Sequence, residues 1–367
     1  MEIPLVDLRS QHAEVAAEIW EGFERLFNSS AYILGEEVAL FEDAFARFSG
    51  VSNCVGVANG TDALELILRA AGVGPGDEVV VPANSFVASA LAVVRAGATP
   101  VFADVDPVYL LLDAEDLSRR ITPACKALLP VHLYGQIPAI EDILDVAASR
   151  GLLVIEDAAQ AQGASRKGVT AGGFGLAAGV SFYPGKNLGA YGDAGAVLTG
   201  SAEVAGVVRN LRNYGTKSKY HHTEIGFNSR LDSMQAVVLN AKLRRLPEWN
   251  ERRRAAAQLY QELLGDMKDV ALPSVLPGNE HIWHLYVVRV PDRDRVVREL
   301  NSEGIGAGVH YPVPIHLQPA FRGFGHKEGD FPTTEAAARE VLSLPLYPEI
   351  TEAQQRRVAE VLARALR

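Results

Sequence analysis

Cysteine is scarce in this sequence, since only Cys54 and Cys125 occur among the 367 residues. The two residues lie far apart, and neither belongs to the Cys/His spacing of a zinc site or to a disulfide framework. Two isolated cysteines are typical of buried thiols in a reducing compartment. We therefore expect a cytoplasmic protein with no metal site and no disulfide.

Long apolar runs and an excess of positive charge are also absent. No stretch approaches the ~20 apolar residues of a membrane-spanning helix, and the start, MEIPLVDLRSQ, lacks the basic and apolar regions of a signal peptide. The formal net charge is −10, which argues against a general nucleic-acid surface. We expect neither a membrane nor a nucleic-acid partner, and an anionic ligand would need a local cationic pocket.

The composition that remains is that of a protein with a large core. Hydrophobic residues make up 48% of the chain and charged residues 22%. From about residue 54 to residue 200, continuous apolar runs alternate with helical patterns. This alternation predicts an α/β domain with a mainly parallel sheet that is covered on both faces. The expected strands lie in EVVVPAN, TPVFADV, KALLPVHLYG, GLLVIEDA, AGVSFYP and GAVLTG, and the expected helices cover residues 61–71, 85–95 and 140–150.

The composition changes in the last third of the chain. Residues 229–264 are rich in Arg, Leu and Ala and predict two long helices broken near Pro247. After them we expect a strand in WHLYVVRV, a helix in RDRVVRELNSEG, a strand in GAGVHYPV and helices around residues 334–342 and 351–365. The pattern predicts a smaller α+β domain, so we divide the chain into a large domain, residues 1–250, and a small domain, residues 251–367.

Lys186 lies in the most informative segment, SFYPGKNLGAYGDAGAV. A strand is expected to end at Tyr183, and Lys186 follows in a glycine-rich loop whose backbone could approach a flat cofactor closely. A lysine amine that loses its proton forms imines with aldehydes. Taken alone, the pattern is more often that of a surface lysine in a flexible loop.

Asp157 ends the expected strand GLLVIEDA. Open α/β sheets bind ligands at the carboxyl ends of their strands, and a buried carboxylate needs a partner. The protonated ring nitrogen of pyridoxal 5′-phosphate (PLP) is such a partner, because the cofactor needs an acid there to act as an electron sink. Asp157 could instead cap a following helix. Gln160 could donate to the ring hydroxyl of the cofactor or face solvent.

Three further segments offer cofactor contacts. Gly60 and Thr61 begin an expected helix, and free amides at a helix start bind phosphate. Thr61 could equally be an ordinary N-cap, with Asp62 favourable to the helix dipole. Ser181, in AGVSFYP, could bind phosphate or its own backbone. Phe86, in VPANSFVAS, could stack on a pyridine ring or belong to the core.

Together these segments supply a phosphate site, a stacking ring, a carboxylate and a lysine, in chain order and near strand ends. The set resembles the DegT/DnrJ/EryC1/StrS family of sugar aminotransferases. The likeness runs from IPLVDLRSQ through ANGTDAL, EDAAQA, SFYPGKNLGA and GFNSRLDSMQA to LSLPLYP. The resemblance implies aminotransferase fold type I, an α/β fold with a mainly parallel sheet of the seven-stranded type and a smaller C-terminal α+β domain.

The resemblance also implies the cofactor and the role of each residue. PLP would form a Schiff base with Lys186, which would then act as general base and acid, while Asp157 would keep the ring nitrogen protonated. Asn228, in GFNSR, would reach the phosphate of the neighbouring subunit, so a homodimer with shared active sites is expected. The cofactor would pass through its pyridoxamine form. The implied cofactor contacts are Gly60, Thr61, Asp62, Phe86, Asp157, Gln160, Ser181, Lys186 and Asn228.

Three segments narrow the resemblance to the branch that aminates carbon 3 of dTDP-3-keto-6-deoxyhexoses, with L-glutamate as donor. They are SFYPGKNLGAYGDAG, RNYGTKSKYHH and GVHYPVPIHLQPAF. Many carbon-4 enzymes have a lysine loop that begins with His-Ser. The cations of RNLRNYGTKSKYHH, among them Arg209, Arg212 and Lys217, would attract the pyrophosphate. Candidate substrate contacts, which could also be plain surface groups, are Tyr183, Tyr214, Lys219, Tyr220, His221, His222, His310, Tyr311 and His316.

Other functions compete with this hypothesis. A carbon-4 nucleotide-sugar aminotransferase is the nearest. A sugar dehydratase on the same scaffold has histidine in place of the imine lysine, so Lys186 argues against it. A non-catalytic PLP-binding regulator or partner has no need of an intact Lys186, Asp157 and Gln160. A dinucleotide-binding oxidoreductase does not fit, because GVGPGDE lacks the G-x-G-x-x-G spacing and precedes a strand.

Overall fold

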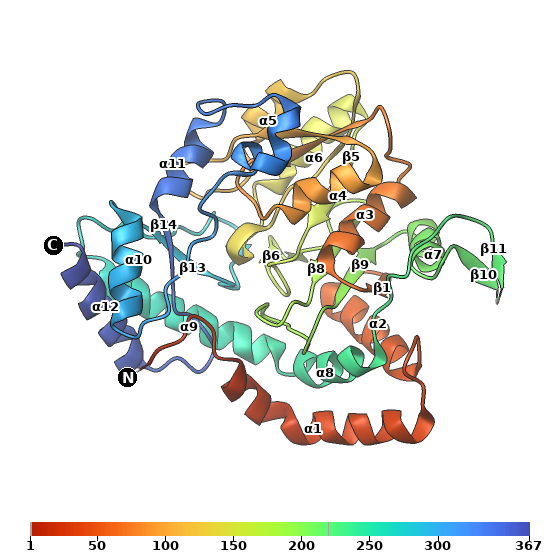
Figure 1. The fold of residues 1–367 in the computed structure, drawn as a ribbon, viewed down its shortest axis with the longest axis horizontal. Coiled ribbons are helices and arrows are strands. Elements are labelled where there is room, and N and C mark those ends of the chain that lie inside the picture. The colour runs from red at the N-terminus through yellow and green to blue at the C-terminus, as the bar shows by residue number, and fades with distance from the viewer. Residues whose placement is uncertain (1, 219) are drawn as a thin grey trace.

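The computed structural model describes residues 2–218 and 220–367, and a seven-stranded sheet lies at its centre (Figure 1). The strands are ordered β1-β9-β8-β5-β4-β2-β3. Only β9 runs antiparallel to its neighbours in this sheet. The mainly parallel sheet that the sequence predicts is therefore confirmed. The strands are β1 (Asn53–Val57), β2 (Glu78–Pro82), β3 (Thr99–Ala103), β4 (Cys125–Leu128), β5 (Leu153–Asp157), β8 (Ala177–Ser181) and β9 (Gly195–Thr199).

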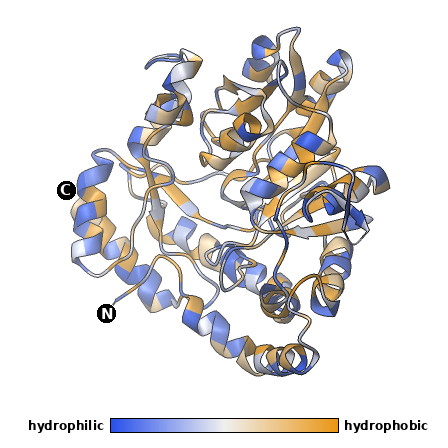
Figure 2. Cartoon of the chain, turned by 45° about the vertical axis from the view of Figure 1, so that its right-hand side comes forward, coloured by the Kyte–Doolittle hydropathy of each residue, from blue (hydrophilic) through white to orange (hydrophobic). Residues whose placement is uncertain are grey.

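Alternate residues of the strands enter two separate cores. Val79 and Val81 of β2 join the cluster under α3, α4 and α7, whereas Val80 joins the cluster under α2, α6 and α8. Both faces are buried, which explains why the strands appear in the sequence as continuous apolar runs. Figure 2 shows apolar residues gathered on the sheet and on the helix faces turned toward it. The covering helices are α2 (Glu36–Ser49), α3 (Gly60–Ala70), α4 (Ala88–Ala96), α5 (Ala114–Arg120), α6 (Ile140–Arg150), α7 (Ala202–Leu211) and α8 (Ser233–Leu243).

The C-terminal part is built around a two-stranded antiparallel sheet of β13 and β14. A third core surrounds it, and Ile3 from the start of the chain packs there beside Ile305. The two termini accordingly lie near each other in Figure 1. The elements are α9 (Leu246–Leu264), β13 (Tyr286–Arg289), α10 (Arg293–Ser302), α11 (Pro332–Glu340), β14 (Val341–Leu344) and α12 (Glu352–Ala365).

Helix α9 links the large sheet to this C-terminal part. Trp249 packs with α8 and with the long N-terminal helix α1 (Leu8–Ser29), whereas Tyr260 packs in the C-terminal core. The two helices expected around Pro247 are thus confirmed, with Pro247 in the first turn of α9, where a missing N–H costs nothing. The division of the chain into domains at residue 250 stays a prediction.

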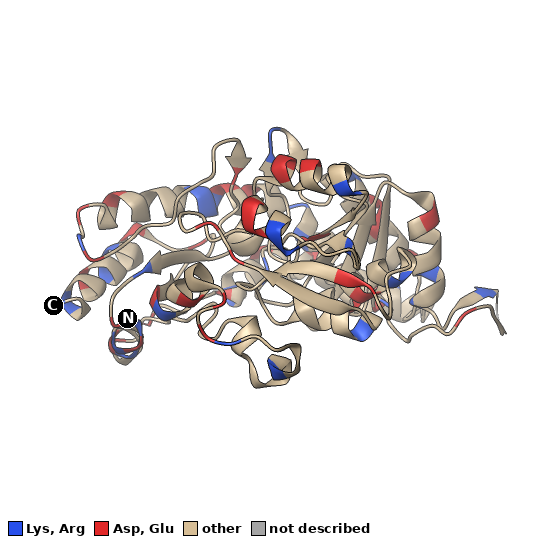
Figure 3. Cartoon of the chain, turned by 90° about the horizontal axis from the view of Figure 1, so that it is seen from above, with Lys and Arg blue, Asp and Glu red and all other residues tan. Residues whose placement is uncertain are grey.

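Short elements complete the fold. A small sheet joins β6 (Ser165–Arg166), β7 (Val169–Thr170) and β12 (Asn279–Glu280), and a hairpin of β10 (Thr216–Ser218) and β11 (His221–His222) stands out from the body (Figure 1). Three 3₁₀ helices are η1 (Leu133–Gly135), η2 (Ile315–Leu317) and η3 (Pro319–Phe324). Basic and acidic residues are interspersed along the helices (Figure 3).

Local signals set many helix ends. Asp7 caps α1, Ser201 caps α7 and Thr351 forms a capping box at α12, while Gly97 and Gly151 end α4 and α6 in the left-handed conformation. No helix in the described part of the chain combines the length and apolar character that crossing a bilayer requires.

Several predicted elements differ from the structure. The expected strand GAGVHYPV is wrong. Within it only Gly308 makes a single bridge, to Ser343, and Pro312 supplies no N–H for a ladder. The strand before Lys186 ends at Ser181 rather than Tyr183. The helix predicted from residue 85 begins at Ala88, and residues 341–344 form β14 instead of continuing the preceding helix.

Candidate active site

A cavity of about 540 Å³ lies at the carboxyl ends of the central parallel strands. That volume falls in the range of small-molecule sites, and the position is the one at which open α/β sheets bind ligands. The cavity wall draws on both ends of the chain as well as on the sheet. It includes Leu5, Val6, Asn59, Gly60, Thr61, Ser85, Phe86, Asp157, Gln160, Ser181, Tyr183, Lys186, Asp193, His284, His310 and Tyr311.

Lys186 is half-buried on this wall. Burial lowers the pKa of its amine to about 8, although the nearby charge of Asp157 acts in the opposite direction. An amine with such a pKa is substantially neutral near pH 8, and only the neutral form attacks a carbonyl. The alternative of a solvated surface lysine does not fit this position.

Lys242 of helix α8 contacts the loop that carries Lys186. Lys242 of α8 is 1% exposed and donates a 2.7 Å hydrogen bond from Nζ to the carbonyl oxygen of Gly189. Its Nζ also lies 4.4 Å from the centroid of the Tyr191 ring. These contacts fix the backbone of the loop just after Lys186.

Asp157 ends β5 and is 5% exposed. Its Oδ2 accepts a hydrogen bond from Ser89 Oγ at 2.7 Å, and its Oδ1 accepts the backbone N–H of Ala159 at 3.1 Å. Turns rather than a helix follow, so the helix-cap alternative is wrong. Two neutral donors leave lone pairs on a buried carboxylate that faces the cavity, and a cationic N–H would satisfy them.

Gln160 is 4% exposed, which rules out the solvent-facing alternative. Its Oε1 accepts the backbone N–H of Tyr134 at 2.7 Å, and its Nε2 donates to Tyr311 Oη at 3.1 Å. Since a backbone N–H can only donate, the orientation of the Gln160 amide is fixed. Burial raises the pKa of the Tyr311 hydroxyl, so Tyr311 stays a neutral phenol.

The start of α3 forms another part of the wall. Asn59, not Thr61, is the N-cap, because its Oδ1 accepts the N–H of Asp62 at 2.8 Å. The amides of Gly60 and Thr61 belong to the first turn and have no partner within the helix. A Cβ on Gly60 would lie 2.8 Å from the Cβ of Ser181, so only glycine allows the helix to begin this close to β8. The result is a cradle of amides beside the Ser181 hydroxyl.

Phe86 is 51% exposed and faces the cavity, with its ring centroid 5.5 Å from that of Tyr311. The alternative of a core aromatic is therefore wrong. Asp62, in contrast, does not reach the cavity wall. Its carboxylate accepts from Ser229 Oγ at 2.8 Å and pairs with Arg95 at 3.1 Å.

The candidate substrate contacts separate into two groups. Tyr183, His310 and Tyr311 line the cavity. His316 does not, because it is 1% exposed and bonded to Glu335 at 3.1 Å. Lys219 lies outside the described residues. The remaining candidates lie at the β10–β11 hairpin, away from the cavity wall of this chain: Tyr214, Tyr220, His221 and His222.

Two other residues expected to bind phosphate groups, Asn228 and Arg212, lie off the cavity wall of this chain. Asn228 is exposed, bridges to Asn213 and is not part of the cavity wall of its own chain. Arg212, expected to be a cation for pyrophosphate, is 8% exposed; it pairs with Glu42 and donates to the carbonyl oxygen of Gly56 at 2.7 Å. The charge of Arg212 is therefore paired within the protein and does not face the cavity.

The sequence did not single out His284, Asp193, Leu5 or Val6, which also line the cavity. His284 and His310 both stay neutral near pH 7. Burial, with the neighbouring charge of Lys186, holds the pKa of His284 well below its usual value and lowers that of His310 to about 4. The only signal of His284 in the sequence is its place as a histidine within the expected strand WHLYVVRV.

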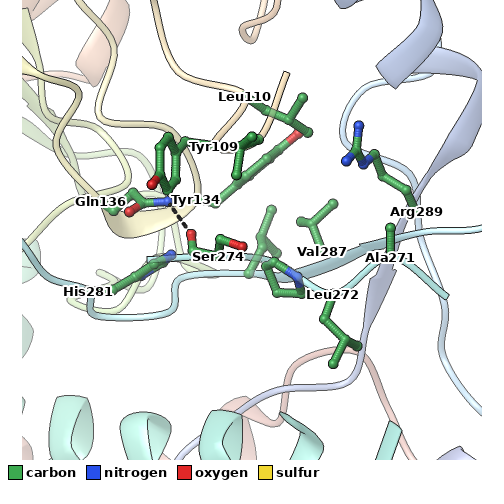
Figure 4. A pocket seen from close by; sticks show the side chains of 13 residues that line it. Tyr109, Leu110, Tyr134, Gln136, Ala271, Leu272, Ser274, His281, Val287 and Arg289 are labelled. Carbon is green, nitrogen blue, oxygen red and sulfur yellow. Dashed lines mark hydrogen bonds between the residues drawn. The ribbon is translucent and has the colours of Figure 1, made fainter. Parts of the chain in front are cut away.

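A second hollow is lined by Tyr134 and shares Leu285 with the large cavity (Figure 4). Tyr109, His281 and Arg289 line it, and Gln136 Nε2 donates to the carbonyl oxygen of Ser274 across it at 3.1 Å. It leaves about 20 Å³, roughly the room for one water molecule. The larger cavity is therefore the candidate active site.

Several known proteins resemble this chain over nearly its whole length. The sequence profile of the DegT/DnrJ/EryC1/StrS aminotransferase family matches residues 13–363. A pleiotropic regulatory protein of Geobacillus stearothermophilus is 45% identical over 99% of this chain and 98% of its own. A dTDP-3-amino-3,4,6-trideoxy-alpha-D-glucose transaminase of Streptomyces venezuelae is 44% identical over 98% and 95%. A UDP-N-acetyl-3-dehydro-alpha-D-glucosamine 3-aminotransferase of Acidithiobacillus ferrooxidans is 44% identical over 99% and 98%.

Solved structures with the same fold cover nearly the whole chain. The S. venezuelae protein DesV, in complex with a ketimine intermediate, has a TM-score of 0.97 at 44% identity, over 100% of this chain and 99% of that one. The Bacillus subtilis protein ntda, with bound cofactor PMP, has a TM-score of 0.90 at 31% identity, over 96% and 82%.

Proposed function

Because the chain belongs to the DegT/DnrJ/EryC1/StrS aminotransferase family, we propose that it is a PLP-dependent transaminase of nucleotide sugars. It moves an amino group from L-glutamate to carbon 3 of a dTDP-3-keto-6-deoxyhexose, in the cytoplasm and as a homodimer. The observation that carries the proposal is that a lysine with a lowered pKa and a buried carboxylate face one cavity, Lys186 and Asp157.

The residues of the cavity fit PLP. Bound PLP would supply an electron sink that stabilises negative charge on the α-carbon of the amino donor. The Asp157 carboxylate would pair with the ring nitrogen, and the exposed face of Phe86 would cover the ring. The amides of Gly60 and Thr61, with the Ser181 hydroxyl, would bind the phosphate, since helix starts favour anions.

Lys186 performs two tasks in this proposal. Its neutral amine would bond covalently to the cofactor, and the pKa of about 8 makes that form accessible near neutral pH. Once free, Lys186 Nζ takes a proton from the α-carbon of the amino donor as a base and later returns a proton as an acid. The same atom serves both half-reactions, so no other base is required.

The choice of carbon 3 is supported by the relatives. The names of the S. venezuelae and A. ferrooxidans enzymes both place the amino group at carbon 3, although one acts on a dTDP sugar and the other on a UDP sugar. The lysine loop and the GVHYPVPIHLQPAF segment favour the dTDP branch. Tyr183, His310 and Tyr311 are the cavity groups that would contact the sugar.

A second candidate function follows from the name of the Geobacillus relative, a pleiotropic regulatory protein. A regulator that binds PLP without catalysis would need the phosphate cradle but not the proton-transfer group. The lowered pKa of Lys186 and the buried Asp157 favour catalysis.

One experiment separates these functions. The pyridoxamine form of the enzyme is mixed with dTDP-linked 3-keto, dTDP-linked 4-keto and UDP-linked 3-keto sugars, and recovery of the PLP absorbance is followed. Rapid recovery with the dTDP-linked 3-keto sugar is expected. Recovery with only the 4-keto sugar would refute carbon 3, and no recovery with any sugar would favour the regulator.

The homodimer rests on a separate observation. Asn228 is exposed and lies off the cavity wall of its own chain. If Asn228 binds a phosphate, as the family resemblance implies, it would reach the cavity of another subunit, and a two-fold dimer would make this exchange reciprocal.

A further inference from the structure

The N-terminal segment of the chain contributes Leu5 and Val6 to the wall of the large cavity. Ile3 fixes this segment to the C-terminal part: its N–H donates to the carbonyl oxygen of Gly304 at 2.8 Å, and its carbonyl oxygen accepts the N–H of Gly306 at 2.7 Å. At its other end the segment continues directly into α1. Leu5 and Val6 are therefore held between two fixed points.

The backbone of Leu5 is packed closely on both sides. A Cβ on Gly306 would lie 2.5 Å from Leu5 N, so only glycine lets the two backbones approach this far. The carbonyl oxygen of Leu5 accepts the N–H of Leu346 at 3.3 Å. The place of Leu5 on the cavity wall is thus set by the C-terminal part of the fold.

The side chains of Leu5 and Val6 differ from the other large aliphatic groups on the cavity wall. Leu64, Val131 and Leu285 pack into the core under α3, α4 and α7. Leu5 and Val6 are half-buried and belong to none of the apolar cores that the described residues form. Their apolar surface is left for a ligand in the cavity to cover.

Leu5 lies beside His310. A Cβ on Gly308 would be 3.2 Å from Leu5 Cδ2 and 3.4 Å from His310 Cε1, so the two side chains border the same backbone position. His310 and Lys186 line one cavity. Besides burial, the charge of Lys186 lowers the pKa of His310, so the histidine ring is within electrostatic reach of that amine. Leu5 is therefore on the side of the cavity where the sugar would react.

The chemistry of the sugar indicates which of its groups would meet Leu5. A 6-deoxyhexose carries a methyl group, carbon 6, on carbon 5 of its ring. Only one ring atom separates carbon 5 from carbon 3, so the methyl group lies close to the carbon that receives the amino group. The nucleotide base is farther away, beyond carbon 1 and two phosphates. An apolar side chain near the reacting carbon therefore meets the methyl group and not the base.

We propose that Leu5 and Val6 form the apolar wall on which the carbon-6 methyl group of the substrate packs, and that they select sugars without a hydroxyl on carbon 6. The inference rests on the proposed function, which supplies the sugar and its reacting carbon. A hydroxyl on carbon 6 would lose its hydrogen bonds to water against these side chains and gain none. An apolar wall of this kind disfavours an added hydroxyl by up to about 100-fold.

The test compares two stable amino sugars in the reverse half-reaction. The PLP form of the enzyme is mixed with a dTDP-linked 3-amino-3,6-dideoxyhexose, or with the 3-amino-3-deoxyhexose of the same configuration, which has a hydroxyl on carbon 6. The amino group passes to the cofactor and a keto group remains on carbon 3. Loss of the PLP absorbance over a range of sugar concentrations gives a second-order rate constant for each sugar, and their ratio is the preference.

We expect the unchanged enzyme to prefer the 6-deoxy sugar by about 10- to 100-fold. Leu5→Asn, which is similar in size but polar, should reduce this preference about 10-fold, mainly by slowing the reaction of the 6-deoxy sugar. Leu5→Met keeps an apolar side chain and should keep the preference. The matched control is Leu8→Asn, the same change at an exposed position of the neighbouring helix turn that does not line the cavity. It should also leave the preference unchanged.

An unchanged preference in Leu5→Asn would overturn the proposal. So would an equal fall in both rate constants, because it would place the contact on a part that the two sugars share. If Leu5→Asn does not fold, Val6→Thr, which adds a hydroxyl with little change in shape, provides the same comparison. Reaction of the unchanged enzyme with neither amino sugar would instead refute the proposed function, and this inference with it.

Discussion

Ser89 Oγ donates a hydrogen bond to Asp157 Oδ2, with 2.7 Å between the oxygens, and Ser85 Oγ lies 2.8 Å behind Ser89. The carboxylate is thus held by one hydroxyl of α4, which Ser85 supports in turn, and it keeps its remaining lone pairs for the cavity. This arrangement suits a group that stabilises a cation on a ligand without giving it a proton.

Asp157→Ala should keep covalent PLP binding, because the phosphate cradle and Lys186 remain, but should slow both half-reactions by at least about 100-fold. The reason is the loss of the charge that keeps the ring nitrogen protonated. Single-turnover absorbance measures each half-reaction. Ser89→Ala, which removes only a neutral donor, is the matched control and should cost much less. Near-normal rates in Asp157→Ala would show that the carboxylate serves only the fold.

Lys186 should make the stability of the cofactor-free enzyme depend on pH. The pKa of Lys186 falls from 10.5 in the unfolded chain to about 8 in the folded protein. Below pH 8 the amine is charged in both states, so the whole free-energy cost of burying that charge lowers the stability of the fold. That cost disappears as the pH rises toward 10.5, where the unfolded amine is also neutral.

Lys186→Met should therefore be more stable than the unchanged chain at pH 7, by about 1–2 kcal/mol. The difference should shrink at about pH 10. Urea unfolding of both proteins at the two pH values measures it. Lys242, whose pKa is also lowered to about 8, is present in both proteins, so its contribution cancels. A difference that does not vary with pH would contradict the lowered pKa of Lys186.

A substitution of Arg212 tests whether this residue stabilises the fold or binds the substrate. It is buried between Glu42 and the Gly56 carbonyl, so Arg212→Met should lower the free energy of unfolding by about 3–5 kcal/mol, because Glu42 loses its partner. Thermal and urea unfolding provide the measurement. Lys217→Met, at an exposed position of the β10–β11 hairpin, should leave stability nearly unchanged. If Arg212→Met instead weakens only sugar binding, the sequence-based role of Arg212 is right.

Asn228 tests the shared active site. Dimers are formed from one Asn228→Ala chain and one Lys186→Ala chain. If Asn228 serves the partner's cavity, one site carries both defects and the other carries none, so the hybrid retains about half the activity of the unchanged dimer. If each site carries one defect, both are impaired, and Asn228 acts within its own subunit.

The sequence predicted those features that depend on neighbouring residues in the chain. A buried strand is predicted from the three consecutive valines Val79, Val80 and Val81 alone. The position of Asp157 at the end of an apolar run likewise predicts a carboxylate at the end of β5. Helix α1 was missed, although Asp7 is an N-cap and Val15, Ile19 and Leu26 form a helical stripe.

Contacts between distant segments could not be predicted in this way. Asn187 and His284 are 97 positions apart, and Gln160 and Tyr311 are 151 apart. Their pairing depends on how the C-terminal part packs over the sheet. Arg212 looked like a free cation because Glu42, 170 positions earlier, gives no local sign of being its partner. For the same reason, His284 gave no sign of its place on the cavity wall.

The most direct test of the account is the identity of the residue that holds PLP. The purified enzyme loaded with PLP is reduced with borohydride, digested and mapped by mass spectrometry. We expect bleaching of the yellow absorbance and a phosphopyridoxyl adduct on Lys186, with Lys242→Met labelled at the same position and Lys186→Ala unlabelled. An adduct on any other lysine, or none at all, would contradict the assignment of Lys186 and with it the proposed reaction.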